Sequence, residues 1–220
     1  PYNGIKIFDG DGFKLPDELE NRVEALVWDE PETLKLADGS ELGDYTQAAT
    51  AVRDYVEHLK ATVPTCLDGL HVAVDCANGS ASVSAALLMD ELGIQADILA
   101  SEPDGVNINE GCGSTHMENL QKYVVEHGLD AGIAFDGDAD RCLCVDEKGN
   151  VVDGDFIMAI CALDMKERGT LRNDTVVGPI MTHLGFQKFF GPNGTPLEAT
   201  PVGSPFVPAA LEVGCCRLRR

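Results

Sequence analysis

Basic residues are scarce in this sequence, and their scarcity excludes some classes of binding partner. The 220 residues contain 16 Lys and Arg against 37 Asp and Glu, which gives a formal net charge of −21 at pH 7. Nucleic acids and anionic membrane surfaces carry dense negative charge, so they repel such a chain. We therefore expect neither as a partner. An anionic ligand would have to be held by a metal ion or by a few well-placed cations.

Long apolar runs and export signals are also missing from these residues. No stretch approaches the roughly 20 apolar residues that span a bilayer. The first residues, Pro1-Tyr2-Asn3-Gly4, show neither a basic region nor an apolar signal core. Hydrophobic residues make up 44% of the chain, which is enough for one large or two small cores. The sequence thus predicts a globular protein of the cytoplasm.

The eight cysteines do not have the spacing of a zinc site. There is no Cys-x-x-Cys pair, Cys215 and Cys216 alone are adjacent, and the other six are scattered among aliphatic segments. This pattern is typical of reduced, buried thiols in a cytosolic protein rather than of a disulfide framework.

Three aspartates at alternate positions are the most informative feature that the sequence does contain. Asp136, Asp138 and Asp140 follow the apolar run 131–135, and Arg141 comes directly after them. Carboxylate oxygens are the ligands that Mg²⁺ prefers in proteins, and a tight turn can bring three of them together. Arginine adds a bidentate donor for phosphate. The sequence therefore predicts a Mg²⁺ site suited to phosphoryl chemistry.

Other interpretations of this loop have to be weighed. Glu147 lies at the twelfth position counted from Asp136, as in an EF-hand, but the sixth position is Arg141 instead of the required glycine. Strands rather than helices are also expected on both sides. A solvated turn without a ligand stays open. A phosphatase of the haloacid-dehalogenase type, with an aspartate nucleophile near a strand end, also stays open.

Periodicity divides the chain into three parts. Residues 1–45 look like the C-terminal remainder of a first domain. Residues 46–170 alternate strands with helices and form a complete α/β domain that carries the aspartate loop. Residues 171–220 begin a third domain without completing it. Strands that alternate with helices predict layered α/β domains with a mixed sheet.

The expected elements follow from hydrophobic spacing and from turn residues. Strands are expected over 4–8, 71–75, 95–99, 131–135, 142–146, 151–152 and 175–178. Helices are expected over 16–28, 44–63, 80–92, 117–126, 155–166 and 184–190, and the helix over 155–166 is expected to close the second domain. From Pro192 onward the chain shows no pattern that predicts a helix or a strand.

Three further segments offer candidate site residues. Lys6 follows an Asn-Gly turn, where it would serve as a proton donor or phosphate clamp, or would simply be exposed. The turn 75–80 either presents backbone N–H groups to an anion or only caps a helix. In the polar loop before the helix at 117, Ser114 and His116 are candidate substrate contacts. The alternative is that Ser114 or Thr115 caps that helix.

Together these segments resemble the α-D-phosphohexomutases, with the motifs in the family's order over roughly residues 1–190. The motifs are Pro1-Tyr2-Asn3-Gly4-Ile5-Lys6, Gly12-Phe13-Lys14-Leu15, Val74-Asp75-Cys76-Ala77-Asn78-Gly79, Glu102-Pro103-Asp104-Gly105-Val106-Asn107-Ile108-Asn109, Gly113-Ser114-Thr115-His116, Ala134-Phe135-Asp136-Gly137-Asp138-Ala139-Asp140-Arg141 and Val152-Asp153-Gly154-Asp155.

The resemblance implies a four-domain cytosolic enzyme in which a phosphoserine exchanges phosphoryl groups with a sugar phosphate through a bisphosphorylated intermediate. The Gly-Ser-Thr-His loop favours the branch that interconverts glucosamine 6-phosphate and glucosamine 1-phosphate, toward UDP-N-acetylglucosamine and the cell wall. Phosphomannomutase and phosphoglucomutase are the nearest rivals. The resemblance further implies that Asp136, Asp138 and Asp140 bind Mg²⁺ together with the phosphoserine. Arg141 would then stabilise phosphoryl oxygens, and Lys6 would move the proton of the attacking hydroxyl.

The chain also departs from the family's pattern. The family's phosphoserine lies in a Ser-His-Asn-Pro loop directly before Tyr-Asn-Gly, and these residues begin at the position of that loop's proline. The Gly-Glu-x-Ser-Gly sugar loop and the C-terminal phosphate-binding domain are not among them. Residues 202–207 read Val-Gly-Ser-Pro-Phe-Val where the family usually reads Val-Gly-Asp-Arg-Tyr-Val. We expect a phosphohexomutase fragment that is inactive by itself. A non-catalytic, metal-binding homologue stays open, as does the oligomeric state.

Overall fold

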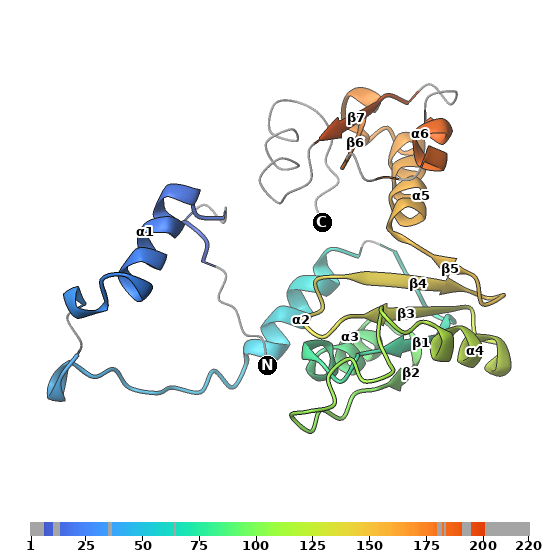
Figure 1. Ribbon diagram of the computed structural model, residues 1–220. Coiled ribbons are helices and arrows are strands. Elements are labelled where there is room, and N and C mark those ends of the chain that lie inside the picture. Colours follow the sequence, from blue (N-terminus) through green and yellow to red (C-terminus); the bar gives the residue numbers. More distant parts are fainter. Residues whose placement is uncertain are drawn as a thin grey trace. The chain divides into compact units, whose positions relative to one another are not determined.

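Strands and helices alternate through the middle of the chain, as Figure 1 shows. The structure is a computed structural model that describes residues 7–10, 14–34, 37–63, 65–179, 182, 184–190 and 195–200. The chain separates into two units, one spanning Pro1–Gln47 and the other Ala48–Arg220.

A mixed five-stranded sheet forms the centre of the second unit, in the order β2-β1-β3-β4-β5. Its strands are β1 (His71–Asp75), β2 (Gln95–Leu99), β3 (Ala131–Phe135), β4 (Cys142–Asp146) and β5 (Val151–Val152). Strand β1 is parallel to both β2 and β3, whereas β4 is antiparallel to β3 and β5. The mixed sheet confirms the predicted fold class, and all five strands cover the predicted ranges.

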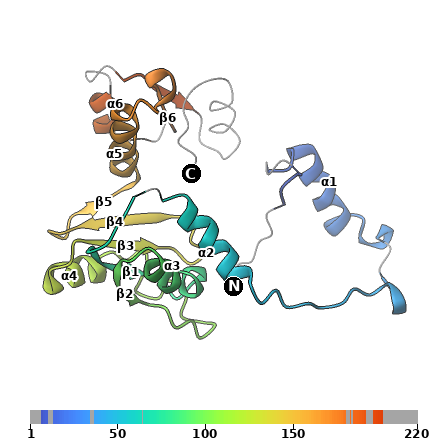
Figure 2. The same ribbon diagram turned by 180° about the vertical axis from the view of Figure 1, so that it is seen from behind.

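The two faces of this sheet have separate apolar cores. On one face α4 (Glu118–His127) packs over the sheet, and the buried residues are Ala73, Met117, Leu120, Val124, Leu129, Ala134 and Val145. On the other face lie the 3₁₀ turn η3 (Ser80–Val83) and α3 (Ala85–Glu91), with Val72, Val74, Cys76, Ala81, Ala85 and Met89 buried. Figures 1 and 2 show this layered α/β/α arrangement from opposite sides.

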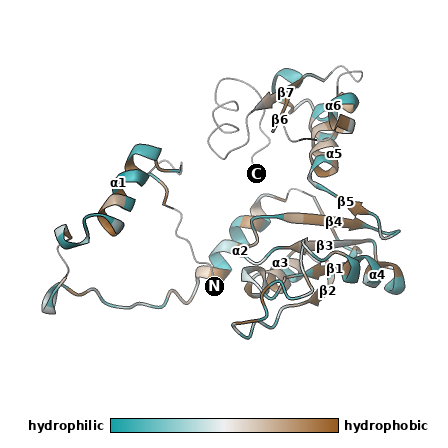
Figure 3. Cartoon of the chain, viewed as in Figure 1, coloured by the Kyte–Doolittle hydropathy of each residue, from teal (hydrophilic) through white to brown (hydrophobic). Residues whose placement is uncertain are grey.

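Helix α4 approaches β3 closely because one strand residue lacks a side chain. A Cβ atom placed on Gly132 would lie 2.8 Å from Val124 Cγ2 and 2.9 Å from Leu120 Cγ. Strands covered on both faces are apolar along their length, and Figure 3 colours the central strands accordingly. Gly132 thus sets how closely α4 lies on the sheet.

Two of the expected helices are shorter than predicted. The helix expected over 44–63 is α2 (Ala51–Ala61), and Tyr45, which precedes it, is 91% exposed and has no apolar surface to pack on. The helix expected over 80–92 is divided into η3 and α3. The N–H of Ser80, at the start of η3, donates to the Gly137 carbonyl of the aspartate loop at 2.9 Å.

The C-terminal described part contains α5 (Gly154–Glu167), η4 (Arg172–Asp174), β6 (Val176–Pro179), α6 (Leu184–Phe190) and β7 (Leu197–Thr200). Strands β6 and β7 are parallel. Their shared core with α5 and α6 contains Ala162, Leu171, Val176, Val177, Phe186 and Phe190. Strand β7 was not predicted, because a short run followed by Pro and Gly does not stand out from a loop.

The first unit holds α1 (Asp17–Trp28), η1 (Pro31–Thr33), η2 (Gly39–Glu41) and one antiparallel bridge between Phe8 and Lys14. Helix α1 confirms the prediction for residues 16–28, and none of its residues is buried. Most of the strand predicted over 4–8 lies outside the described residues. In the part of the chain that the structure describes, no helix is long and apolar enough to cross a membrane.

Candidate metal centre

Three loops meet at one edge of the sheet, where the parallel strands β1, β2 and β3 end. They are the turn 76–79 after β1, the loop 100–117 after β2 and the aspartate loop 136–141 after β3. In open α/β sheets this carboxyl edge is where ligands bind. The aspartate loop connects β3 with the antiparallel strand β4, so it is flanked by strands as predicted.

The aspartate loop brings its three carboxylates together. Asp136, Asp138 and Asp140 each offer one oxygen, and these oxygens lie within 4.8 Å of one another. Asp136 is 5% exposed, whereas the other two side chains are exposed. The turn closes through a hydrogen bond from Ala139 N to the Asp136 carbonyl at 3.0 Å, with Ala139 in the left-handed region at φ 57°.

This donor set fits a hard divalent cation. Mg²⁺ binds oxygen at about 2.0–2.1 Å, so two oxygens on one ion lie at most about 4.2 Å apart. The exposed carboxylates of Asp138 and Asp140 can close the remaining gap by rotating their side chains. A site with three carboxylates from one loop leaves the other coordination positions to water or phosphate.

Arg141 holds the buried aspartate of this cluster. Its Nε lies 2.9 Å from Asp136 Oδ2 and 3.6 Å from Asp140 Oδ1. The Arg141 backbone N–H donates to Asp136 Oδ1 at 3.2 Å. The arginine side chain is nevertheless 72% exposed, so most of the guanidinium faces solvent beside the cluster. Charge-assisted contacts of this kind hold the Asp136 carboxylate in place and compensate for its burial.

The turn after β1 does not offer N–H groups to an anion, so that prediction is wrong. All four N–H groups of residues 77–80 donate within the protein, which leaves none for a ligand. The pairs are Ala77 N with Asp75 Oδ1 (2.9 Å), Asn78 N with Ala100 O (2.6 Å), Gly79 N with Cys76 O (2.8 Å) and Ser80 N with Gly137 O (2.9 Å).

This turn instead packs tightly against the aspartate loop. A Cβ atom on Gly79 would lie 2.7 Å from Gly137 Cα, and one on Gly137 would lie 2.6 Å from Ile108 Cδ1. At Gly79 the contact is with backbone and leaves no room for a side chain, whereas at Gly137 it is with the Ile108 side chain; backbone hydrogen bonds, such as that from Asn78 N to Ala100 O at 2.6 Å, join the third loop. The three loops are therefore interlocked through their backbones, which restricts where the aspartate loop can lie.

The Gly-Ser-Thr-His segment lies beside the start of the aspartate loop. Ser114 N donates to the Phe135 carbonyl at 2.9 Å, one residue before Asp136, and Ser114 is half-buried. His116 is exposed, and its Nδ1 lies 3.1 Å from Thr115 Oγ1. Helix α4 starts without a side-chain capping bond, so the alternative role of Ser114 or Thr115 as a cap is wrong.

Asp75 is a residue of this edge whose importance the sequence did not reveal. It ends β1, is 3% exposed, and accepts hydrogen bonds from Ala77 N at 2.9 Å and Gly113 N at 2.8 Å. In the sequence Asp75 appeared as the first residue of the turn 75–80 and within a motif of the family resemblance, but neither pattern assigned a role to its carboxylate. Lys6, the other predicted site residue, lies outside the described residues.

Two buried thiols, those of Cys76 and Cys112, lie near this edge. Burial, followed by the charge of Asp75, raises the pKa of Cys76 to about 11. Burial also raises the pKa of Cys112. Because their pKa values are raised, both cysteines are neutral thiols at physiological pH. The cysteines of the described part are free, but the expectation that they are buried is wrong for most of them, since Cys76 and Cys112 are buried whereas Cys66 and Cys142 are exposed.

Two family models match this chain. The model for α/β/α domain II of phosphoglucomutase/phosphomannomutase matches residues 53–149, and that for domain III matches residues 153–217. The first match contains the whole five-stranded sheet except the short strand β5, together with the aspartate loop. The second begins at Asp153, directly before α5.

Curated relatives are similar along most of the chain. A phosphoglucosamine mutase of Symbiobacterium thermophilum is 52% identical over 207 residues, which cover 94% of this chain and 46% of that protein. A phosphoglucosamine mutase of Caldanaerobacter subterraneus is 50% identical over 206 residues, with the same coverage of 94% and 46%. The chain thus spans about half the length of the curated relatives it matches.

Solved structures show the same fold. A phosphoglucomutase/phosphomannomutase family protein from Burkholderia thailandensis has a TM-score of 0.71 at 21% identity, covering 90% of this chain and 42% of that one. A putative phosphomannomutase from Thermus thermophilus has a TM-score of 0.66 at 19% identity, covering 86% and 43%. From its sequence relatives, its two family domains and its fold, this chain belongs to the α-D-phosphohexomutase family of phosphoglucomutases and phosphomannomutases.

Proposed function

We propose that this chain is part of a cytoplasmic phosphohexomutase that interconverts glucosamine 6-phosphate and glucosamine 1-phosphate. The observation that carries the proposal is the cluster of three carboxylates beside Arg141, at the carboxyl edge of the sheet. The names of relatives at about 50% identity favour glucosamine phosphate over other hexose phosphates.

Asp136, Asp138 and Asp140 would hold Mg²⁺. The acidic oxygens alone would repel a phosphate group, and the chain's charge of −21 adds to this repulsion. A bound divalent cation reverses the local charge and neutralises the negative charge that develops on a transferring phosphoryl group. This requirement explains why a strongly acidic chain that handles phosphate needs a metal loop.

Arg141 would donate to the phosphoryl oxygens. Its exposed guanidinium retains donors beyond the Nε that contacts Asp136, and a planar guanidinium suits the geometry of phosphate. Ser114 and His116 would contact the sugar phosphate, since the backbone of Ser114 is bonded next to the aspartate loop. Lys6 would move the proton of the attacking hydroxyl, as the family resemblance implies.

The phosphoryl donor implied by the resemblance is a serine in a Ser-His-Asn-Pro loop, which the 220 residues do not contain. Turnover is therefore to be measured in a longer protein, and these residues alone are expected to bind without catalysis. The rival proposal is a metal-binding homologue without activity. On that proposal, even a longer form of the protein would not catalyse the reaction.

We propose the domain boundary at residues 152–153 rather than near 170. The buried residue of α5, Ala162, shares its core with β6 and α6. The Asp153 carboxylate caps the start of this helix by accepting from the N–H groups of Asp155 and Phe156. The domain III match also begins at residue 153. Residues 1–47 would belong to a first domain.

Calorimetric titration of the 220-residue chain with Mn²⁺ or Mg²⁺ tests the metal site. Asp138→Asn should abolish measurable binding, because it removes one of three charged ligands. Asp90→Asn is the matched control, since it removes the same charge from an exposed position on α3. Binding that survives in the Asp138 variant, or disappears in both, would contradict the assignment.

The substrate is tested in a longer protein that contains the sugar loop, by repeating the titration with glucosamine 1,6-bisphosphate and then with glucose 1,6-bisphosphate. We expect the amino sugar to enhance metal binding more than the glucose compound. The reverse order would favour a phosphoglucomutase. An aspartate nucleophile would instead leave a base-labile phosphoaspartate at Asp136 or Asp138 after incubation with a phosphate ester, and we expect no such adduct.

A further inference from the structure

We propose that Asp75 is a positioning residue, whose buried carboxylate holds the Ser114–His116 segment against the metal loop. This inference rests on the proposed function, in which Asp136, Asp138 and Asp140 hold a metal. Asp75 itself is not a ligand in that scheme. It acts through the backbone of the loop between β2 and α4.

The carboxylate of Asp75 joins two loops that are far apart in the sequence. Oδ1 accepts from Ala77 N at 2.9 Å, in the turn after β1, and Oδ2 accepts from Gly113 N at 2.8 Å. With 3% exposure, this carboxylate has little contact with water. Two short, charge-assisted bonds are therefore its main compensation for burial in the described structure.

The position of Gly113 is transmitted directly to the metal loop. Gly113 has φ +75°, and a Cβ atom on it would lie 2.6 Å from both Ala77 Cβ and Phe135 O. The next residue, Ser114, donates its N–H to that same Phe135 carbonyl at 2.9 Å. Asp75 therefore fixes the position of Gly113 between β1 and β3. The positions of Ser114 and His116 depend in turn on that of Gly113.

A carboxylate is needed at position 75, because both of its oxygens are acceptors. Asparagine has nearly the same shape but offers only one acceptor oxygen, and its NH₂ group would face an N–H donor. Asp75→Asn therefore breaks one of the two connections while leaving side-chain volume unchanged. The connection to Gly113 is the longer-range one, and we expect it to loosen.

The test is nuclear magnetic resonance on the 220-residue chain with Mn²⁺, a paramagnetic substitute for Mg²⁺. Bound Mn²⁺ broadens resonances according to their distance from it. We expect the His116 ring signals to broaden strongly in the wild type. His127 is the internal reference. It ends α4 shortly before the start of β3, whereas the aspartate loop follows the end of β3, so the two lie at opposite ends of that strand.

In Asp75→Asn we expect Mn²⁺ affinity within about two-fold of the wild type, because the ligands are untouched. The His116 broadening should fall by more than half. Amide exchange at Gly113 should accelerate by roughly 10- to 100-fold beyond any change at the core amide of Val74. A purely structural loss of stability would instead accelerate both amides equally and leave the broadening unchanged, which would overturn the proposal.

Asp104→Asn is the matched control. The Asp104 carboxylate also accepts two backbone N–H groups, those of Val106 and Asn107, but in the exposed part of the same loop. We expect it to leave the His116 broadening unchanged. If Asp75→Asn does not fold, the rate of amide hydrogen exchange at Gly113 in the wild type is the deciding measurement. A Gly113 amide that exchanges as fast as exposed amides would overturn the proposal. Absence of Mn²⁺ binding in the wild type would instead count against the proposed function.

Discussion

The Nε of Arg141 lies 2.9 Å from Asp136 Oδ2, so the most buried carboxylate of the metal cluster is shared with a cation of the protein itself. A metal ion that binds Asp136 through Oδ2 would compete with this contact. Once displaced, the guanidinium would be free to meet phosphate oxygens beside the ion. Under the proposed function, the pair would thus link metal binding with phosphate binding.

Arg141→Gln should bind Mn²⁺ more tightly than the wild type, by up to about five-fold. The substitution removes a competing positive charge, and exposed pairs of this kind contribute roughly 0.2–1 kcal/mol. Affinity for a sugar bisphosphate in the presence of the metal should fall, because the phosphate donor is lost. Calorimetry measures both constants.

Arg168→Gln is the control for this experiment. Arg168 makes a similar contact, with Nε 2.9 Å from Asp164 Oδ1, but on the surface of α5. It should change neither constant. A weaker affinity of Arg141→Gln for Mn²⁺ would mean that the arginine orders Asp136 for the metal instead of competing with it.

Gly132→Ala should lower the free energy of unfolding by roughly 1–3 kcal/mol, because the new methyl group would overlap Val124 and Leu120 of α4. Urea denaturation measures the change. Gly154→Ala is the matched control, since a Cβ atom there meets no atom within 4 Å. Equal stability of wild type and Gly132→Ala would show that α4 can shift away from the sheet without cost.

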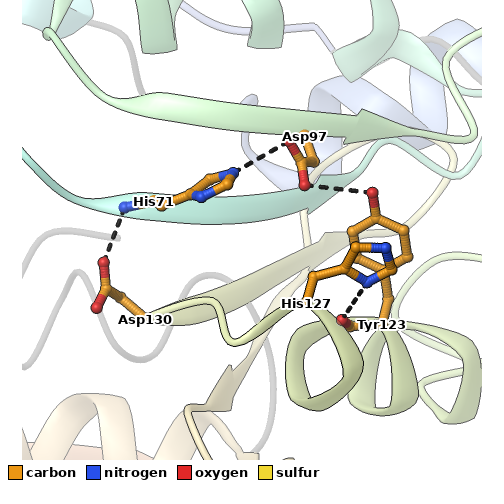
Figure 4. Close-up of polar contacts among 5 residues, drawn as sticks. All are labelled: His71, Asp97, Tyr123, His127 and Asp130. Carbon is orange, nitrogen blue, oxygen red and sulfur yellow. Dashed lines mark hydrogen bonds and ion pairs between the residues drawn. The ribbon is translucent and has the colours of Figure 1, made fainter.

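The stability of the sheet should depend on pH through Asp97, which His71 and Tyr123 contact (Figure 4). Asp97 Oδ1 lies 3.1 Å from His71 Nε2, and Oδ2 accepts from the Tyr123 hydroxyl at 3.2 Å. The hydrogen bond with His71, followed by that with Tyr123, lowers the pKa of the Asp97 carboxyl. A lowered folded-state pKa stabilises the protein above the unfolded value of about 3.9, and this contribution is lost as the pH falls through the folded value.

Asp97→Asn should therefore unfold at lower urea concentration than the wild type at pH 7, by about 1 kcal/mol. The difference should shrink below about pH 4, where the wild-type carboxyl becomes protonated. Asp90→Asn, which removes an exposed charge, serves as the control. A difference that stays constant down to pH 3 would indicate that Asp97 acts by packing alone.

Cys144 should be the more readily alkylated of two contrasting thiols. The neighbouring Cys142 thiol lowers the pKa of Cys144, whereas burial, followed by the charge of Asp75, raises the pKa of Cys76 to about 11. Since the thiolate is the nucleophile, iodoacetamide should label Cys144 with a midpoint below that of an ordinary thiol and leave Cys76 unlabelled. Peptide mass spectrometry measures both.

Cys142→Ala removes the hydrogen-bond donor, so the midpoint for Cys144 should rise toward the ordinary thiol value of about 8.5. Cys66→Ala, at an exposed position away from this pair, should leave the midpoint unchanged. Labelling of Cys76 before Cys144 would contradict the assignment of the thiolate.

Local chemistry was enough to predict the strands and the metal-binding candidates. Strands 71–75 and 131–135 are short apolar runs bounded by turn residues, and such runs have few alternatives. Asp136, Asp138 and Asp140 are separated by single residues, so any tight turn brings their carboxylates together. For the same reason the family resemblance could be read from motifs that each lie within one loop.

Contacts between distant segments were not readable in this way. The N–H groups of residues 77–80 looked available to an anion, and two of their partners, Ala100 and Gly137, lie on other loops that a local pattern does not reveal. The helix predicted over 155–166 has apolar residues on several sides, so its spacing does not reveal which core it joins. Strand β7 becomes recognisable only when it pairs with β6.

The sequence by itself determined the alternation of strands and helices and the cluster of acids that points to a metal, because both depend on neighbours within a few residues. The tertiary structure decided how the three loops interlock and made Asp75 a common acceptor for two of them, the turn after β1 and the loop after β2. That role depends on Gly113, 38 residues away along the chain, and no local pattern encodes it. Only the folding of β1, β2 and β3 into one sheet brings these groups to hydrogen-bonding distance.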